Sequence, residues 1–389
     1  MNNIDDKDIM KKQYSPLLYL SALGAGGIAV MFFAVINYTF DHGEGLANVS
    51  QVSLENLDWW KYWVFCGFEV GMVVFSLIHL FLSLYLLPGL IRFVRHENFK
   101  DFINDPLKNA AIVAPLISIV MSINVMLSVV RFFVPYLYDN LQQFMLPGLL
   151  AWGLLYLLIM LVEILLLKIS FTNGFDIGKI NFGWLLHPFV LGMLTVTGTG
   201  IAAMAKDYDI ATIAMVLTIV SGSMGLFLLL VKTITLFTSH FAATGLPEKQ
   251  FLPSLLIVIP NITLYAISFF RLAHYFERHH EAHIHTFQQV VVLTAWAFET
   301  WYLIFGLVLL VDYFKKYFRK DFTISQWGLV CPFVAYVVLG AFVYKMILGY
   351  DFVFVYLLIF LLITLWLFFN LLVKQTACWG QKTSYFNCE

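Results

Sequence analysis

The chain has 389 residues, of which 61% are hydrophobic and only 12% are charged, and its formal net charge is −1. Soluble domains carry about 25% charged residues, so this composition excludes an ordinary soluble protein and favours one that lies in lipid. The near-neutral balance says little about partners, and we expect lipid and a small substrate rather than nucleic acid.

Ten segments are long and apolar enough to cross a bilayer, since a membrane helix needs about 20 predominantly apolar residues. The alternation expected of a transmembrane β-strand is absent. We therefore predict an all-α integral membrane protein with one transmembrane domain over residues 1–389 and short cytoplasmic tails at 1–15 and 375–389. In chain order the predicted spans are 16–38, 62–91, 109–134, 144–167, 184–205, 210–237, 251–271, 287–311, 324–348 and 351–374.

The basic residues indicate how these spans are oriented. If the N-terminus is inside, 17 of the 23 lysines and arginines fall on the inner side and six on the outer side. Lysine and arginine accumulate on the cytoplasmic side of short loops. We therefore expect both termini in the cytoplasm and a multi-pass protein of the plasma membrane, which in a bacterium is the inner membrane.

Four prolines repeat along the chain at nearly constant spacing. Pro115, Pro188, Pro260 and Pro332 are separated by 73, 72 and 72 residues, and each lies in the first half of an odd-numbered span. Proline kinks a helix because it removes a backbone donor, and the freed carbonyl then needs a partner inside the protein or in water. The spacing predicts five helical hairpins, with odd spans inside and even spans outside. For any one proline, ordinary helix packing is the competing interpretation.

The odd spans also carry polar residues that an inner pathway would use. Their C-terminal ends carry basic residues, and a ring of lysine or arginine selects anions in a pore. Complementing the helix dipole is the alternative role of such cations. No acidic residue lies inside an odd span, which argues against a cation pore or a proton-driven carrier built on inner carboxylates. The predicted polar lining is Ser122, Asn124, Thr197, Thr199, Asn261 and Thr263, and the predicted outer basic ring is Arg131, Lys206, Arg271 and Lys345.

Buried acids are expected only on even spans, at Glu69, Glu163 and Glu299. Ionisable residues inside a membrane are functional candidates by default. On outer helices, hydrogen bonds between helices or subunits are an equally good explanation.

The segment from Arg271 to Phe287 is predicted to be a histidine-rich outer loop. Imidazoles bind zinc, copper or nickel, so a metal is the one cofactor that the sequence suggests. A solvated loop whose charge changes with pH is the alternative. The candidate ligands are His279, His280, His283 and His285.

The chain resembles the TehA-type tellurite-resistance/dicarboxylate transporter family, which includes the slow-type anion channels of plant guard cells. This resemblance implies ten helices in five hairpins, a pore lined by odd helices, a small inorganic anion or carboxylate as substrate, and a trimer. It also implies that a phenylalanine of the ninth helix occludes the pore, for which Phe333 beside Pro332 is the first candidate and Phe342 the second. The matching segments are Ala114-Pro115 through Asn124, His187-Pro188 with the Gly/Thr run after it, Leu252-Pro253-Ser254 through Pro260, and Cys331-Pro332-Phe333.

Two rival functions remain open at this point. A haem- or quinone-binding redox subunit would use His79, His187 and the outer histidines, although haem needs axial ligands that face one another. A metal-responsive membrane protein would use the histidine-rich loop. The sequence contains no nucleotide motif and no credible nucleophile–base pair, so we do not expect an enzyme.

Overall fold

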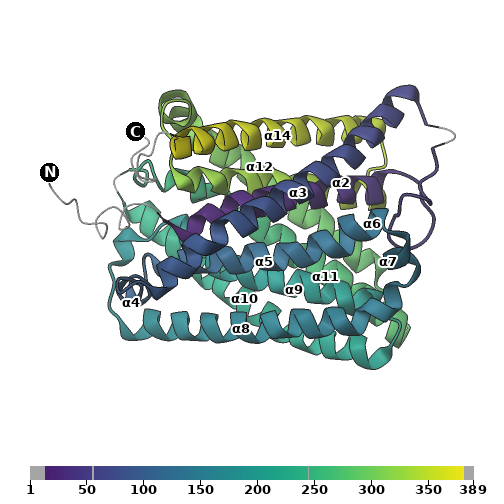
Figure 1. The fold of residues 1–389 in the computed structure, drawn as a ribbon, viewed down its shortest axis with the longest axis horizontal. Coiled ribbons are helices and arrows are strands. Elements are labelled where there is room, and N and C mark those ends of the chain that lie inside the picture. The colour runs from purple at the N-terminus through teal and green to yellow at the C-terminus, as the bar shows by residue number, and fades with distance from the viewer. Residues whose placement is uncertain (1–13, 55–56, 244, 381–389) are drawn as a thin grey trace.

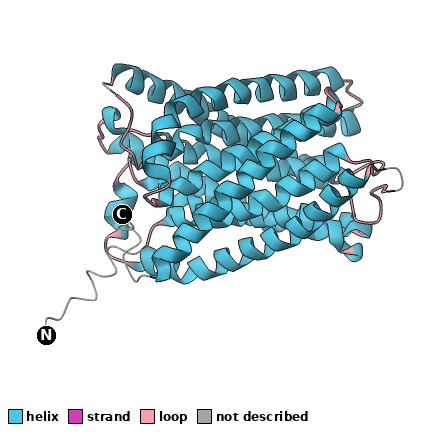
Figure 2. Cartoon of the chain, turned by 90° about the horizontal axis from the view of Figure 1, so that it is seen from above, coloured by secondary structure: helices cyan, strands magenta, loops and turns pink. Residues whose placement is uncertain are grey.

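The computed structural model describes residues 14–54, 57–243 and 245–380. Within those ranges all regular structure is helical, and the loops gather at the two ends of the bundle (Figure 2). Ten helices in the described chain are long and apolar enough to cross a membrane. The predicted all-α integral membrane fold is therefore confirmed.

The ten spans divide into an inner ring and an outer layer. In their most apolar stretches, 44–100% of the residues of odd spans are buried, against 28–39% for even spans. The inner-ring helices are α2 (Tyr19–Thr39), α5 (Val113–Val125), α9 (Leu186–Met204), α11 (Val258–His280) and α13 (Val330–Met346). The outer helices are α3 (Trp59–Arg95), α8 (Met145–Thr172), α10 (Tyr208–Ala242), α12 (His285–Tyr313) and α14 (Asp351–Gly380).

The inner helices form a closed ring. Helix α2 packs on α5, α5 on α9, α9 on α11, α11 on α13, and α13 returns to α2. The outer helices cover this ring, and α8 and α14 lie along opposite edges of the bundle with α5, α9 and α11 between them (Figure 1). This order matches the predicted hairpins, since each odd span enters the ring and each even span returns outside it.

The repeated prolines lie at the starts of the inner α-helices. Pro115, Pro188, Pro260 and Pro332 are each the third residue of their α-helix, directly after a short 3-10 helix. Proline is tolerated in a first helical turn because the missing N–H would there lack an intrahelical acceptor. The prolines therefore lie beside the junction between the 3-10 and α parts of each span, in its first half as predicted, and their spacing marks equivalent points of the repeat. The 3-10 helices are η2 (Asn109–Ile112), η6 (Phe182–Leu185), η7 (Leu252–Ile257) and η9 (Ile324–Leu329).

These 3-10 helices close one face of the ring, which we call the N-side face because every inner helix starts there. Together with η1 (Pro16–Leu18) they form a second, smaller ring in which each helix contacts its two neighbours. Its side chains are tightly packed: Leu185, Leu256 and Trp327 are fully buried. Trp327 Nε1 donates to Gln375 Oε1 of α14 at 2.5 Å, which ties the small ring to the outer layer.

Several segments expected to be tails or loops are ordered. The predicted C-terminal tail is helical up to Gly380, and the predicted histidine-rich loop is helical up to His280, so the loop itself spans only 281–284. A helix satisfies its own backbone groups and can therefore continue past the apolar layer into water. The rest of the predicted tails, 1–13 and 381–389, lies outside the described residues.

The connection between α2 and α3 folds over the far face, opposite the N-side face. Asn37 holds it: its Oδ1 accepts from Ala47 N at 2.8 Å, and its carbonyl lies 2.8 Å from His42 Nε2. Arg131 Nη2 donates to Ala47 O at 2.6 Å, which joins this loop to the third span. The loop therefore narrows the far end of the ring.

Candidate functional site

A cavity of about 850 Å³ lies inside the inner ring. All five inner helices contribute to its wall, from Phe189, Pro260 and Cys331 near the helix starts to Met204 and Arg278 near the helix ends. The packed 3-10 ring lies beyond its inner end, so the cavity faces the far side of the protein. Such a recess, mostly apolar with a few convergent polar groups, is typical of a binding site.

Asn124 and Thr197 form a polar bridge across the wall between α5 and α9. Asn124 Nδ2 donates to Thr197 Oγ1 at 2.7 Å, and the Thr197 hydroxyl donates to Met193 O at 2.8 Å. Both residues line the cavity, as does Thr263 on α11. The donors of this bridge already have acceptors, since Asn124 Nδ2 also donates to Val120 O at 3.2 Å, so the bridge ties the two helices together and adds polar dipoles to the wall at mid-depth.

Arg271 is the charged group that reaches deepest into the cavity wall. Its Nη1 donates to Val196 O of α9 at 2.6 Å, and among the described residues no carboxylate pairs with it. Gly200 makes room for it, because a Cβ at that position would lie 3.2 Å from Nη1. The guanidinium has five N–H donors, so four remain for another acceptor in an electrostatically positive recess.

The mouth of the cavity carries further cations. Arg278, two turns after Arg271, donates to Ala203 O at 2.8 Å, and Lys206 is exposed at the rim. The single carboxylate on the described wall is Glu277, which lies 3.0 Å from His274 Nδ1. The entrance therefore has an excess of positive charge.

Three aromatic rings meet on the wall in the half of the ring nearer the far face. The Phe342 ring lies 3.9 Å from that of Tyr38 and 5.0 Å, edge-on, from that of Phe270, measured between centroids. All three line the cavity and come from different inner helices. Phe333 does not line it: its ring faces outward, stacked on Phe360 of α14 at 6.4 Å. Of the two predicted gate residues, only Phe342 borders the cavity.

The remaining predicted site residues are divided between wall and packing. Ser122 faces His79 of α3, Thr199 donates to Val196 O, and Asn261 donates to Ile257 O, and none of the three lines the cavity. The sequence thus identified the correct helices, and it placed three of the six predicted polar residues, Asn124, Thr197 and Thr263, on the face that lines the cavity. The wall residues that we did not predict include Asn37, Tyr38, Ser128, Gln142, His274, Glu277 and Arg278.

The four basic residues do not form one ring. Lys206 and Arg271 line the cavity, whereas Arg131 is buried against the loop after α2, with its guanidinium carbon 5.8 Å from the Phe33 ring centroid. Lys345 is exposed away from the cavity. Arg278 follows Arg271 by seven residues, about two helical turns, and this spacing in the sequence could have predicted that both lie on the same face of α11.

The histidines near the far face do not gather into a metal centre within the described chain, where no group of three or more ligand residues converges. His279 contacts the rings of Tyr208 and Tyr275, with centroids 5.5 and 5.0 Å away. His280 also packs on Tyr275, and His283 and His285 border a surface hollow with Glu277 and Glu281.

The histidines proposed for a redox centre occupy different helix interfaces. His79 of α3 is held between α2 and α5, with Nδ1 2.8 Å from Ala22 O and Nε2 2.8 Å from Ser122 Oγ. His187 of α9 pairs with Glu163 of α8. The two are not the facing pair of ligands that a haem requires.

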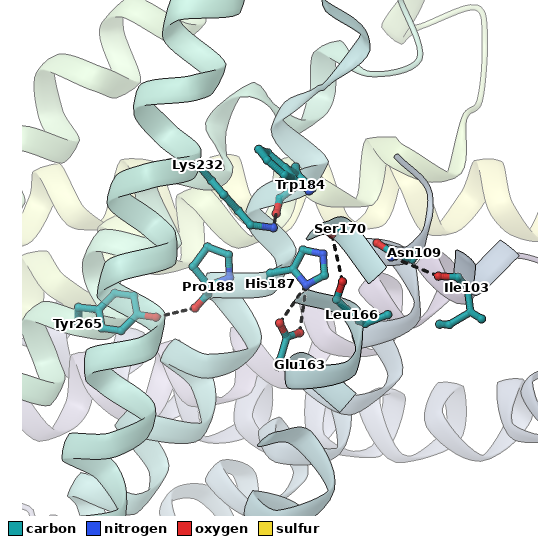
Figure 3. A network of polar contacts seen from close by, with 10 residues as sticks. All are labelled: Ile103, Asn109, Glu163, Leu166, Ser170, Trp184, His187, Pro188, Lys232 and Tyr265. Carbon is teal, nitrogen blue, oxygen red and sulfur yellow. Dashed lines mark hydrogen bonds and ion pairs between the residues drawn. The ribbon is translucent and has the colours of Figure 1, made fainter. Parts of the chain in front are cut away.

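A buried polar network joins α8, α9 and α10 outside the cavity (Figure 3). His187 Nδ1 lies 2.9 Å from Glu163 Oε2, and Lys232 Nζ lies 3.5 Å from Trp184 O and 4.1 Å from the Trp184 ring. Pro188 cannot donate to Trp184 O, the acceptor four residues earlier, so Lys232 serves that carbonyl instead. All three ionisable side chains are at least 95% buried.

Comparison with known proteins places the chain in a family. No curated protein sequence gives a match. The family model described as voltage-dependent anion channel matches residues 13–376, nearly the entire chain, and this confirms the resemblance drawn from the sequence. The protein is thus a multi-pass membrane protein that belongs to the voltage-dependent anion channel family, whose members are anion channels or transporters.

Proposed function

We propose that small anions cross the membrane through the cavity of the inner ring, and that Arg271 is the group that draws them in. The observation that carries the proposal is a guanidinium without a carboxylate partner among the described residues, on the wall of a recess ringed by five helices. An ion leaving water needs its hydration replaced by fixed dipoles and charges. Arg271 supplies the charge, and the bonded pair Asn124 and Thr197 adds polar dipoles at mid-depth.

The same proposal assigns closure to Phe342. Its ring and those of Tyr38 and Phe270 narrow the space from three sides, and apolar constrictions gate pores by excluding water. Small changes in helix position would separate the three rings, because they belong to different inner helices.

The experiment is anion flux from proteoliposomes that contain purified protein, comparing chloride, nitrate, sulfite and a dicarboxylate. Arg271→Gln is expected to lower flux of the preferred anion by about tenfold or more, since two unit charges 4 Å apart attract by about 4 kcal/mol at an effective dielectric of 20 and about 1.4 kcal/mol corresponds to tenfold. The matched control is Arg92→Gln, which changes an exposed arginine in the last turn of α3, at the N-side face. This variant is expected to keep wild-type flux. Equal flux in wild type and Arg271→Gln would remove Arg271 from the pathway.

We also propose the plasma membrane as the location, with the N-side face in the cytoplasm, and a homotrimer as the assembly. The charge asymmetry of the loops supports the orientation. The family resemblance supports the trimer.

A further inference from the structure

One acidic side chain reaches the cavity wall from the outer layer. Glu299 belongs to α12 and is fully buried, yet its Oε1 lies 2.5 Å from the hydroxyl of Thr263, which lines the cavity. Its other oxygen, Oε2, has no hydrogen-bond partner among the described residues. The carboxyl is thus separated from the cavity by the side chain of one wall residue.

The hydrogen bonds at Thr263 indicate which form of the carboxyl fits. The hydroxyl has one proton, but its oxygen lies 3.2 Å from Ile259 O as well as 2.5 Å from Glu299 Oε1. Neither of those oxygens carries a proton if Glu299 is a carboxylate. Both contacts are satisfied when Glu299 donates to Thr263 and Thr263 donates to Ile259 O. The geometry therefore suits a protonated Glu299.

No positive charge compensates Glu299. Within the described chain no lysine, arginine or histidine forms an ion pair or hydrogen bond with it. On α13 the nearby titratable group is Tyr336, which hydrogen-bonds Thr300 of α12 and Tyr356 of α14. On α11, His274 and Glu277 contact α12 at Gln288, about three turns away. The 3-10 helix η7, which also packs on α12, has no titratable residue.

We propose that Glu299 couples proton binding to anion binding, so that the protein takes up an anion together with a proton. The inference rests on the anion pathway proposed above. An anion in contact with the Thr263 side chain in the cavity would lie within roughly 7 Å of the carboxyl, one contact distance plus one hydrogen bond. At that separation the anion and an ionised Glu299 repel each other.

The sign of the coupling follows from linkage. Loss of the Glu299 proton as pH rises weakens anion binding, and by reciprocity anion binding takes up a proton. The Thr263 hydroxyl is the contact through which the carboxyl exchanges that proton with cavity water. This coupling differs from that of a proton-driven carrier with carboxylates on its inner helices, because Glu299 lies on an outer helix.

The test compares wild type with Glu299→Gln, a neutral isostere of the protonated side chain, in proteoliposomes at matched internal and external pH between 5 and 8. In wild type the nitrate and chloride concentrations for half-maximal flux rise with pH, approaching about tenfold per pH unit when only the protonated form binds. In Glu299→Gln they stay constant at the wild-type low-pH value. Glu69→Gln, a carboxyl on α3 away from the cavity, retains the wild-type pH dependence.

A second measurement needs no variant that might fold poorly. Nitrate added to weakly buffered, detergent-solubilised wild-type protein is expected to cause proton uptake, read by a pH-sensitive dye. Absence of uptake, or an identical pH dependence of flux in wild type and Glu299→Gln, overturns the coupling but leaves the anion pathway standing. Absence of flux for every anion at every pH instead overturns the pathway.

Discussion

At the scale of single residues, the partner of a side chain decides its role more than its type or position in the repeat does. Arg131 and Arg271 both lie near the ends of inner spans. Arg131 is enclosed by the loop after α2 and donates to Ala47 O, so its role is to hold that loop against the third span. Arg271 has one carbonyl partner and borders the cavity. Only the second borders the space through which we propose that anions pass.

The two phenylalanines of α13 provide a matched pair for the gate. Phe342→Ala is expected to raise basal anion flux, because it removes the ring that Tyr38 and Phe270 contact. Phe333→Ala removes an equally buried ring on the α14 side and is expected to leave flux per folded molecule unchanged. Both variants should lose roughly 3–5 kcal/mol of stability. Flux measured against the amount of folded protein separates the effects, and a rise in Phe333→Ala alone would move the gate to Phe333.

At the scale of elements, each outer helix does more than cover the ring. Several insert a polar side chain into an inner-ring interface: His79 of α3 bonds α2 and α5, Trp152 of α8 donates to Leu194 O at 3.0 Å, and Glu299 of α12 meets Thr263. In lipid such groups need protein partners. These contacts fix the rotation of each outer helix, and one of them reaches the cavity.

The network of Glu163, His187 and Lys232 predicts coupled stability between α8 and α10. Lys232→Met leaves Trp184 O without its donor and removes a positive charge that acts on Glu163, which should cost about 1–3 kcal/mol. Adding Glu163→Gln removes the buried negative charge, so the double variant should be more stable than the sum of the single effects predicts. Thermal unfolding in detergent measures this, with Lys168→Met on exposed α8 surface as the control. Strictly additive losses would show that Glu163 and Lys232 do not interact.

At the scale of the whole molecule, two stacked rings explain why the cavity has one open end. The five 3-10 helices pack closely at the N-side face, whereas the inner helices above them leave space between their side chains. Each unit of the repeat therefore contributes a 3-10 helix to the closed N-side face and an inner helix to the wall of the cavity.

The orientation of the molecule is testable with fusions at the C-terminus. We expect green fluorescent protein fused there to fluoresce in a bacterial host and alkaline phosphatase fused there to be inactive, because both predicted tails are cytoplasmic. An active phosphatase fusion would place the cavity mouth on the cytoplasmic side.

The proposed assembly gives a second prediction at this scale. Light scattering of the purified protein, corrected for detergent, should give three times the chain mass of 44.6 kDa. A mass equal to that of one chain would contradict the proposed trimer, and the family resemblance would then apply to the fold of a single chain but not to its assembly.

The sequence by itself determined the membrane class, the ten helices, the division into inner and outer sets, and the family. These depend on the length and composition of apolar segments and on a proline spacing, all of which are local or periodic properties of the chain. Four prolines, Pro115, Pro188, Pro260 and Pro332, marked equivalent points of the repeat, each just after a 3-10 helix.

Only the tertiary structure decided which side chains share the cavity. Successive residues of an α-helix point in directions about 100° apart. Asn124 therefore lines the cavity, whereas Ser122, two positions earlier, packs against His79 of α3. The helix rotations are set by contacts between residues far apart in sequence, such as His79 with Ser122. For the same reason, the sequence did not predict that Glu299 lies beside the cavity. That position follows from the packing of α12 against α11, where Glu299 meets Thr263.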